Sequence, residues 1–169
     1  LQSEGPPVQV PCVIIVSRAL ASASSGNWRT ALFWSRMLAS TYRTRIVQDW
    51  PVAEAMTGSD TPVAMLALHA RRSAPAIQAW AHSHPGQGLA VVLTGTDLYR
   101  DILDHAAAQA SLQLAQRLVV LQERGPDALP AGLRGKTRVI FQSTTSRQPL
   151  EKSSRFLRAV MVGHLREEK

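Results

Sequence analysis

Short runs of apolar residues recur along the chain, and alanine-rich or polar segments separate them. Uninterrupted apolar runs of this length are typical of strands that are buried on both faces of a sheet. Pro11 has no backbone N–H, so pairing in the first run is expected to begin only at Cys12. The pattern predicts strands at residues 8–16, 42–47, 63–68, 89–93, 117–121 and 138–141.

The segments between these runs have helical spacing. A first helix is predicted at residues 27–40, and a long alanine- and leucine-rich one at residues 98–116. Another helix is expected to begin after Ser73, which is a good N-cap, with Pro75 in its first turn. Alternating strands and helices predict an α/β fold, a Rossmann-like parallel sheet with helices on both faces.

The pattern also suggests how the chain divides into domains. We interpret residues 1–11 as a flexible tail and residues 12–142 as the Rossmann-like domain. Residues 143–156 are polar and rich in serine and threonine, with Pro149 in the middle, so they are interpreted as an interdomain linker. Residues 157–169 resume with an apolar strand and a glycine-led loop, which we interpret as the start of a second domain.

Composition narrows the class of protein. Apolar residues make up 45% of the chain and charged residues 18%, which is typical of a globular protein. No apolar run approaches the roughly 20 residues that a membrane helix needs, so no membrane partner is expected. Cys12 is the only cysteine, which excludes a disulfide within the chain and favours the cytoplasm.

The net charge is +7, from 19 lysines and arginines against 12 acidic residues. A positive net charge is typical of proteins that bind nucleic acid, a membrane surface or small anions. Here the arginines are dispersed, without a run of five or six basic residues. This dispersion favours small anionic ligands, and no nucleic-acid partner is expected.

Ligands of parallel α/β sheets bind at the carboxyl ends of the strands, where three loops carry unusual residues. The first loop, residues 24–29, has small residues and Gly26 before a helix N-terminus, with Asn27 in the first turn. Such a loop suits an anion, and Arg29 would reinforce it. An ordinary helix start explains the same pattern.

The second loop, residues 69–73, places two adjacent arginines between a buried strand and a helix. Arg71 and Arg72 are suited to phosphate-like oxygens, although pairing with carboxylates or exposure to solvent would also account for them. His69 is either a base that contacts the substrate or a structural residue.

The third loop, residues 94–101, has Gly95 among polar residues near its start. Glycine permits close backbone approach of a ligand. Asp97 either contributes its carboxylate to the ligand site or caps the next helix. Arg100 either faces the cleft or pairs with Asp101 or Asp104. The candidate anion-binding residues of this loop are Thr94, Gly95, Thr96, Asp97 and Arg100.

Other common site motifs are absent from the sequence. It has no GxGxxG fingerprint, no Walker phosphate loop and no GxSxG nucleophile motif. The histidines show no HxxxH or histidine–carboxylate spacing of metal-ligand type. We therefore expect no metal and no cofactor, and a mechanism based on positioning and electrostatics. The five histidines are His69, His82, His84, His105 and His164.

Four motifs carry a resemblance that covers residues 13–169. They are GNW at 26–28, HARRSA at 69–74, LTGTDLYRD at 93–101 and LVVLQ at 118–122. Together they resemble the amino-terminal half of retaining-type GT-B glycosyltransferases, in particular the selenosugar synthases of selenoneine biosynthesis. The HARRSA and LTGTDLYRD motifs are the more specific ones.

This resemblance implies two Rossmann-like domains facing across a cleft, with the acceptor in the first and the nucleotide sugar in the second. It implies transfer of a sugar from UDP-N-acetylglucosamine to selenophosphate, which gives a 1-selenosugar and releases UDP and phosphate. The residues that would line the acceptor side are Gly26, Asn27, Arg71, Arg72, Thr94 and Asp97.

Residues 162–169 resemble the first loop of the donor domain in this superfamily. The family pattern has an arginine directly after the glycine and a lysine five residues later, and both hold the donor diphosphate. Here His164 follows Gly163, Lys169 matches the lysine, and Arg166 is the candidate substitute for the missing arginine. The family's ribose-binding carboxylates would lie beyond Lys169, so this chain alone is expected to be inactive.

Two other functions fit the sequence. An ordinary GT-B transferase acting on a hydroxyl acceptor would need a base, for which His69 and Asp97 are the candidates. A non-catalytic basic α/β module that binds nucleic acid is the second. The sequence leaves the sugar, the outcome at the anomeric carbon and the oligomeric state open.

Overall fold

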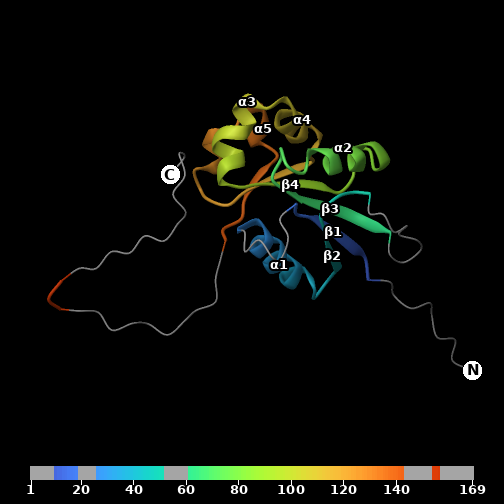
Figure 1. Ribbon diagram of the computed structural model, residues 1–169, viewed down its shortest axis with the longest axis horizontal. Helices are drawn as coiled ribbons and strands as arrows, with labels where there is room; N and C mark the ends of the chain where they lie inside the picture. The colour runs from blue at the N-terminus through green and yellow to red at the C-terminus, as the bar shows by residue number, and fades with distance from the viewer. Residues whose placement is uncertain (1–9, 19–25, 52–60, 143–153, 157–169) are drawn as a thin grey trace, which may run out of the picture.

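The computed structural model describes residues 10–18, 26–51, 61–142 and 154–156. Its centre is a six-stranded sheet in which every pair of neighbouring strands is parallel, in the order β2-β1-β3-β4-β5-β6 (Figure 1). The strands are β1 (Cys12–Val16), β2 (Arg43–Val47), β3 (Pro62–Leu68), β4 (Leu89–Leu93), β5 (Arg117–Val120) and β6 (Thr137–Val139).

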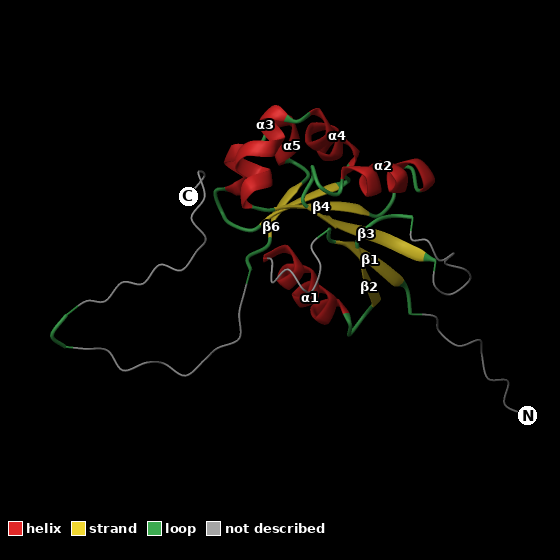
Figure 2. Ribbon diagram, in the orientation of Figure 1, coloured by secondary structure: helices red, strands yellow, loops and turns green. Residues whose placement is uncertain are grey.

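Helices cover both faces of this sheet. Figures 1 and 2 show α1 (Gly26–Leu38) on one side and most of the other helices on the opposite side. The second group comprises α2 (Ala74–Ser83), π-helix η3 (Asp97–Asp101), α3 (Ile102–Asp104), α4 (Ala106–Leu114), the 3₁₀ helix η4 (Gly125–Ala128) and α5 (Ala131–Arg134). The predicted Rossmann-like α/β fold is therefore confirmed.

The core follows from side chains that alternate across each strand. In β4, Val91 and Leu93 belong to the larger apolar cluster, which also contains Trp80 of α2. Val92, between them, belongs to a smaller cluster with Trp34 of α1. Both faces of the strand are thus buried, which explains why the strands are uninterrupted apolar runs in the sequence.

The strand boundaries agree with the prediction to within a few residues. Pairing of β1 begins at Cys12, after Pro11, as expected from the missing N–H of proline. The last strand is shorter and earlier than the predicted 138–141, although Ile140 still donates its N–H to the carbonyl of Val120.

The single helix predicted at residues 98–116 is wrong, because the segment is divided into η3, α3 and α4. His105 separates α3 from α4 in an extended conformation, with φ −110° and ψ 114°. The side-chain amide of Gln109 donates to the carbonyls of Ile102 and Leu103, which would otherwise lack partners at a helix end. A glutamine that stabilises a break leaves no sign in the apolar pattern.

Several expectations fall on parts of the chain outside the described residues. These are nearly all of the tail, most of the linker at 143–156, the start of the second domain and its donor-diphosphate residues, Gly163, His164, Arg166 and Lys169.

Among the described residues, the helices are all too short or too polar to cross a membrane.

Candidate functional site

The loop that follows β3 makes a sharp turn at the carboxyl edge of the sheet. His69 continues the sheet by donating its N–H to the carbonyl of Val92, at 2.9 Å, and then adopts a left-handed φ of 77°. This conformation is uncommon for a residue with a side chain and is often found at functional sites. Ser73 occupies the N-cap position of α2 as predicted, but its hydroxyl donates to the carbonyl of Leu68 instead of capping the helix.

The backbone of this loop is held by two other elements. Asp97 of η3 is fully buried, and its carboxylate accepts hydrogen bonds from the N–H groups of Ala70, at 2.7 Å, and Arg71, at 3.4 Å. Ser111 of α4 donates its hydroxyl to the carbonyl of Ala70, at 2.9 Å. Fixed on both sides, the loop turns Ala70 inward and leaves Arg71 and Arg72 exposed.

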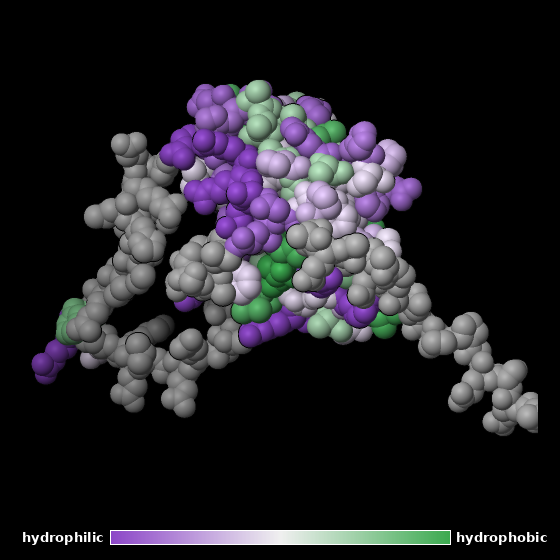
Figure 3. All heavy atoms as spheres, turned by 45° about the vertical axis from the view of Figure 1, so that its right-hand side comes forward, coloured by the Kyte–Doolittle hydropathy of each residue, from purple (hydrophilic) through white to green (hydrophobic). Residues whose placement is uncertain are grey.

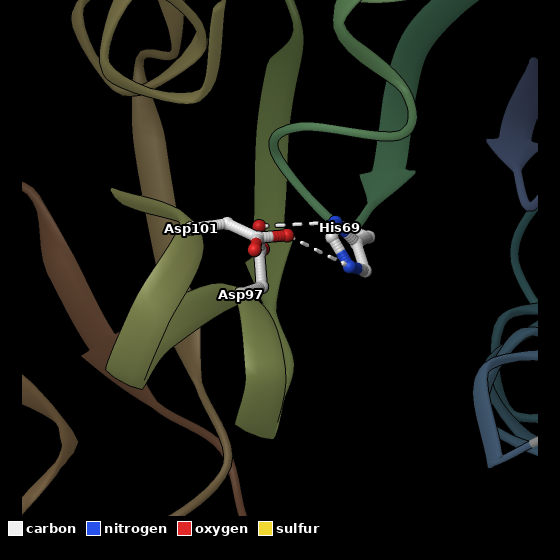
Figure 4. A group of neighbouring side chains, drawn as sticks. All are labelled: His69, Asp97 and Asp101. Carbon is white, nitrogen blue, oxygen red and sulfur yellow. Dashed lines mark ion pairs between the residues drawn. The ribbon is translucent and has the colours of Figure 1, made fainter. Parts of the chain in front are cut away.

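The imidazole of His69 faces two buried carboxylates that lie next to each other (Figure 4). Its Nδ1 is 3.0 Å from Oδ1 of Asp97, and its Nε2 is 3.6 Å from Oδ2 of Asp101. Asp97 and Asp101 are four residues apart, which places both on the same face of the helical turn. When Nδ1 is protonated it donates to Asp97, and when it is not it accepts the N–H of Arg72, at 3.3 Å.

Three basic side chains surround the other oxygen of Asp101. Oδ1 lies 3.5 Å from Nη1 of Arg71, 3.3 Å from Nε of Arg100 and 3.9 Å from Nε2 of His105. The carboxylate is only 2% exposed, whereas the side chains of Arg71 and Arg100 are 46% and 47% exposed. A buried negative charge therefore holds basic groups whose other sides face solvent.

Hydrophilic residues form a broad band on the face drawn in Figure 3, next to a smaller hydrophobic group. At the carboxyl edge of the sheet, Arg71 and Arg100 present exposed guanidinium groups, whereas the carboxylates of Asp97 and Asp101 are buried. Such an arrangement favours an anion on the solvent side.

His69, Asp97 and Asp101 also form a group whose ligand-type atoms all lie within 4.8 Å of one another. One histidine and two carboxylates are residue types that zinc and manganese use. However, the oxygens of Asp97 already accept backbone N–H groups, and Oδ1 of Asp101 is surrounded by cations. This donor set fits an ion-pair network better than a metal centre. The cluster could not be recognised in the sequence, because His69 and the two aspartates come from separate loops.

The remaining predicted residues of the third loop lie at its start. Thr94 and Thr96 are half-buried, and Gly95 is exposed. A Cβ built on Gly95 would meet no atom within 4 Å, so neither a neighbour nor its φ requires glycine there. The third loop contacts the second through Asp97, which accepts backbone N–H groups, and through Asp101, which pairs with Arg71.

The first loop is represented only by its helical part, because residues 24 and 25 are outside the described residues. Gly26 and Arg29 are exposed and Asn27 is half-buried in the first turn of α1. Arg29 lines a small cavity of about 120 Å³ together with Thr30, Phe33, Trp34 and Gln142. This cavity lies at α1, on the opposite side of the sheet from α2 and α3 (Figure 1).

Sequence reasoning also missed Ser17, at the carboxyl end of β1. Its side chain is 1% exposed, and its hydroxyl has no hydrogen-bond partner among the described residues. A serine in a loop of small residues gives no sign that its hydroxyl is buried.

No known protein family model matches this chain, and no curated protein matches it in sequence.

Proposed function

We propose that the chain is the acceptor-binding part of a cytoplasmic UDP-sugar-dependent glycosyltransferase. The acceptor is selenophosphate, the donor is UDP-N-acetylglucosamine, and the product is a 1-selenosugar. One observation carries this proposal most: the two most specific motifs of the family resemblance, residues 69–74 and 93–101, are in direct contact at the carboxyl edge of the sheet through Asp97. Parallel α/β sheets bind their ligands at this edge.

The charge at this edge supports a small anionic acceptor. Arg71 pairs with the buried carboxylate of Asp101, and its side chain remains 46% exposed to solvent. A guanidinium group donates two parallel hydrogen bonds to oxyanions such as phosphate. A neutral hydroxyl acceptor would not need this arrangement.

The chemistry requires little from a protein base. Selenium in selenophosphate is a soft nucleophile, and in this proposal it attacks C1 of the sugar while the bond from C1 to UDP breaks. Hydrolysis of the selenium–phosphorus bond then releases phosphate. His69 and Asp97 are both buried and engaged with each other, so neither is assigned as a base. Orientation and stabilisation of the leaving UDP supply the catalysis.

The test uses the complete gene product that contains this chain. It is incubated with UDP-N-acetylglucosamine and selenophosphate, and the products are analysed by mass spectrometry. A new sugar product with the isotope pattern of selenium is expected. Replacing Arg71 with alanine should abolish this product. Arg117→Ala, an exposed arginine at the opposite end of the strands, should not.

Two outcomes would contradict the proposal. Release of UDP without selenium in the product would indicate a transferase with a hydroxyl acceptor. No release of UDP by the folded protein, with other UDP-sugars also tried, would exclude a UDP-sugar transferase.

A further inference from the structure

We propose that Asp101 is a positioning residue for an oxyanion site, in which it fixes the guanidinium of Arg71 to bind a phosphate-type dianion. The anion binds on the solvent side of Arg71, opposite Asp101. Arg100 and His105 complete the basic rim of this site. From the sequence, Asp101 is a candidate partner of Arg100 and is not among the residues expected to bind the anion.

The geometry around Asp101 separates a buried inner side from an exposed outer side. The carboxylate is 2% exposed, and its Oδ2 faces His69 in the interior. Its Oδ1 faces Arg71, Arg100 and His105, whose side chains are 46%, 47% and 40% exposed. All three basic groups are thus held from the inside and reach solvent on the outside.

Electrostatics explain why a carboxylate is useful at this position. Two guanidinium groups repel each other, and long exposed side chains otherwise sample many rotamers. A buried carboxylate between them offsets the repulsion and reduces this freedom. The side chain of Arg71 therefore loses less conformational entropy when the anion binds.

The two adjacent arginines have different environments in the structure. Arg71 contacts Asp101, and its backbone N–H is held by Asp97. Arg72 is also exposed, but the contact described for it is a backbone hydrogen bond to His69. We therefore assign anion binding to Arg71, and a substitution of Arg72 serves as the matched control for the loss of an exposed arginine.

The direction in which removal of the Asp101 charge changes the affinity for phosphate distinguishes two roles of this residue. If Asp101 is simply a negative charge near the site, it repels an anion, and its removal strengthens binding. If it positions Arg71, its removal weakens binding although the net charge of the protein becomes more positive. Asp101→Asn keeps the size of the side chain and changes its charge, so it separates these two cases.

The experiment titrates the 169-residue chain with inorganic phosphate at constant ionic strength and pH 7.5, without any sugar donor. Binding is followed through the Nε–H signals of the arginines by NMR. Asp101→Asn and Arg71→Lys should each raise the Kd for phosphate by roughly fivefold or more, because charge-assisted hydrogen bonds are lost or misaligned. Arg72→Lys should change it less than about twofold.

A double variant tests whether Asp101 acts through Arg71. In the Arg71→Lys background, Asp101→Asn should cause no further loss of phosphate affinity. Tighter or unchanged phosphate binding by Asp101→Asn would overturn the inference, as would the absence of phosphate binding by the unchanged chain. If Asp101→Asn does not fold, the exposed variants decide: equal losses in Arg71→Lys and Arg72→Lys would also overturn it.

The identity of the natural anion rests on the proposed function, but phosphate binding is measured independently of sugar transfer. A chain that binds phosphate as expected and transfers no sugar would overturn the proposed function alone. Selenosugar formation with phosphate affinity unaffected by Asp101→Asn would overturn this inference alone.

Discussion

Asp97 was expected to line the binding site, but its carboxylate fixes the backbone of the neighbouring loop. Its carboxylate is fully buried and accepts the N–H groups of Ala70 and Arg71, while Oδ1 lies 3.0 Å from Nδ1 of His69. A carboxylate suits this position because it has only acceptors, whereas an amide would turn a donor toward an N–H group. Asp97 thus shapes the loop that presents Arg71.

This role predicts the effect of Asp97→Asn on stability. The variant should lower the free energy of unfolding by about 2 to 3 kcal/mol, because at least one buried donor loses its acceptor. Asp104→Asn, at an exposed position a few residues further along, is the matched control and should change it by less than about 0.5 kcal/mol. Urea unfolding measures both, and equal effects of the two variants would show that the buried hydrogen bonds of Asp97 contribute little.

The environment of His69 could be predicted from the sequence only in part. A histidine at the end of an apolar strand could be recognised as notable. Its left-handed φ and its contacts with two carboxylates could not be predicted, because Asp97 and Asp101 come from the loop after the next strand. No local pattern connects residues so distant in the sequence.

At the scale of elements, Gly88 and Gly86 explain how β4 begins so close to β3. Both glycines have positive φ, 57° and 70°. A Cβ on Gly88 would also lie 2.4 Å from the carbonyl oxygen of Val63, whereas a Cβ on Gly86 would meet nothing within 4 Å. The first position therefore combines backbone strain with a clash, and the second has backbone strain only.

This pair gives a prediction with its own control. Gly86→Ala should lower the free energy of unfolding by about 1 kcal/mol, the usual cost of placing alanine in a left-handed conformation. Gly88→Ala should cost at least about 2 kcal/mol, because the backbone of β3 must also move. Thermal or urea unfolding of both variants provides the comparison. Similar losses in the two would mean that the contact between β3 and Gly88 relaxes freely.

The strands could be predicted from the sequence because their burial is written into the apolar pattern. Residues 13–16 and 89–93 are buried on both faces or nearly so, and such segments must be apolar throughout. The division of residues 98–116 could not be predicted, because it depends on side-chain hydrogen bonds from Gln109 and not on a glycine or proline. Patterns of polarity report burial, and they do not report such local competition for carbonyls.

At the scale of the whole molecule, the parallel topology determines which loops meet. Strands β3 and β4 are neighbours in the sheet, so the loops that follow them lie side by side at the carboxyl edge. The shared edge was predictable once the sheet was expected to be parallel, whereas the order of the strands was not. The direction of each side chain was not, and Asp97 and Arg71 differ in this respect: one is buried and the other is exposed.

The most direct test of the account is a comparison of KM values in the complete gene product. Arg71→Lys should raise the KM for selenophosphate by roughly tenfold, which corresponds to the loss of charge-assisted hydrogen bonds. The KM for the UDP-sugar should stay within about twofold, and Arg72→Lys should leave both values nearly unchanged. A rise in the KM for the UDP-sugar, with the KM for selenophosphate unaffected, would contradict the assignment of this edge to the acceptor.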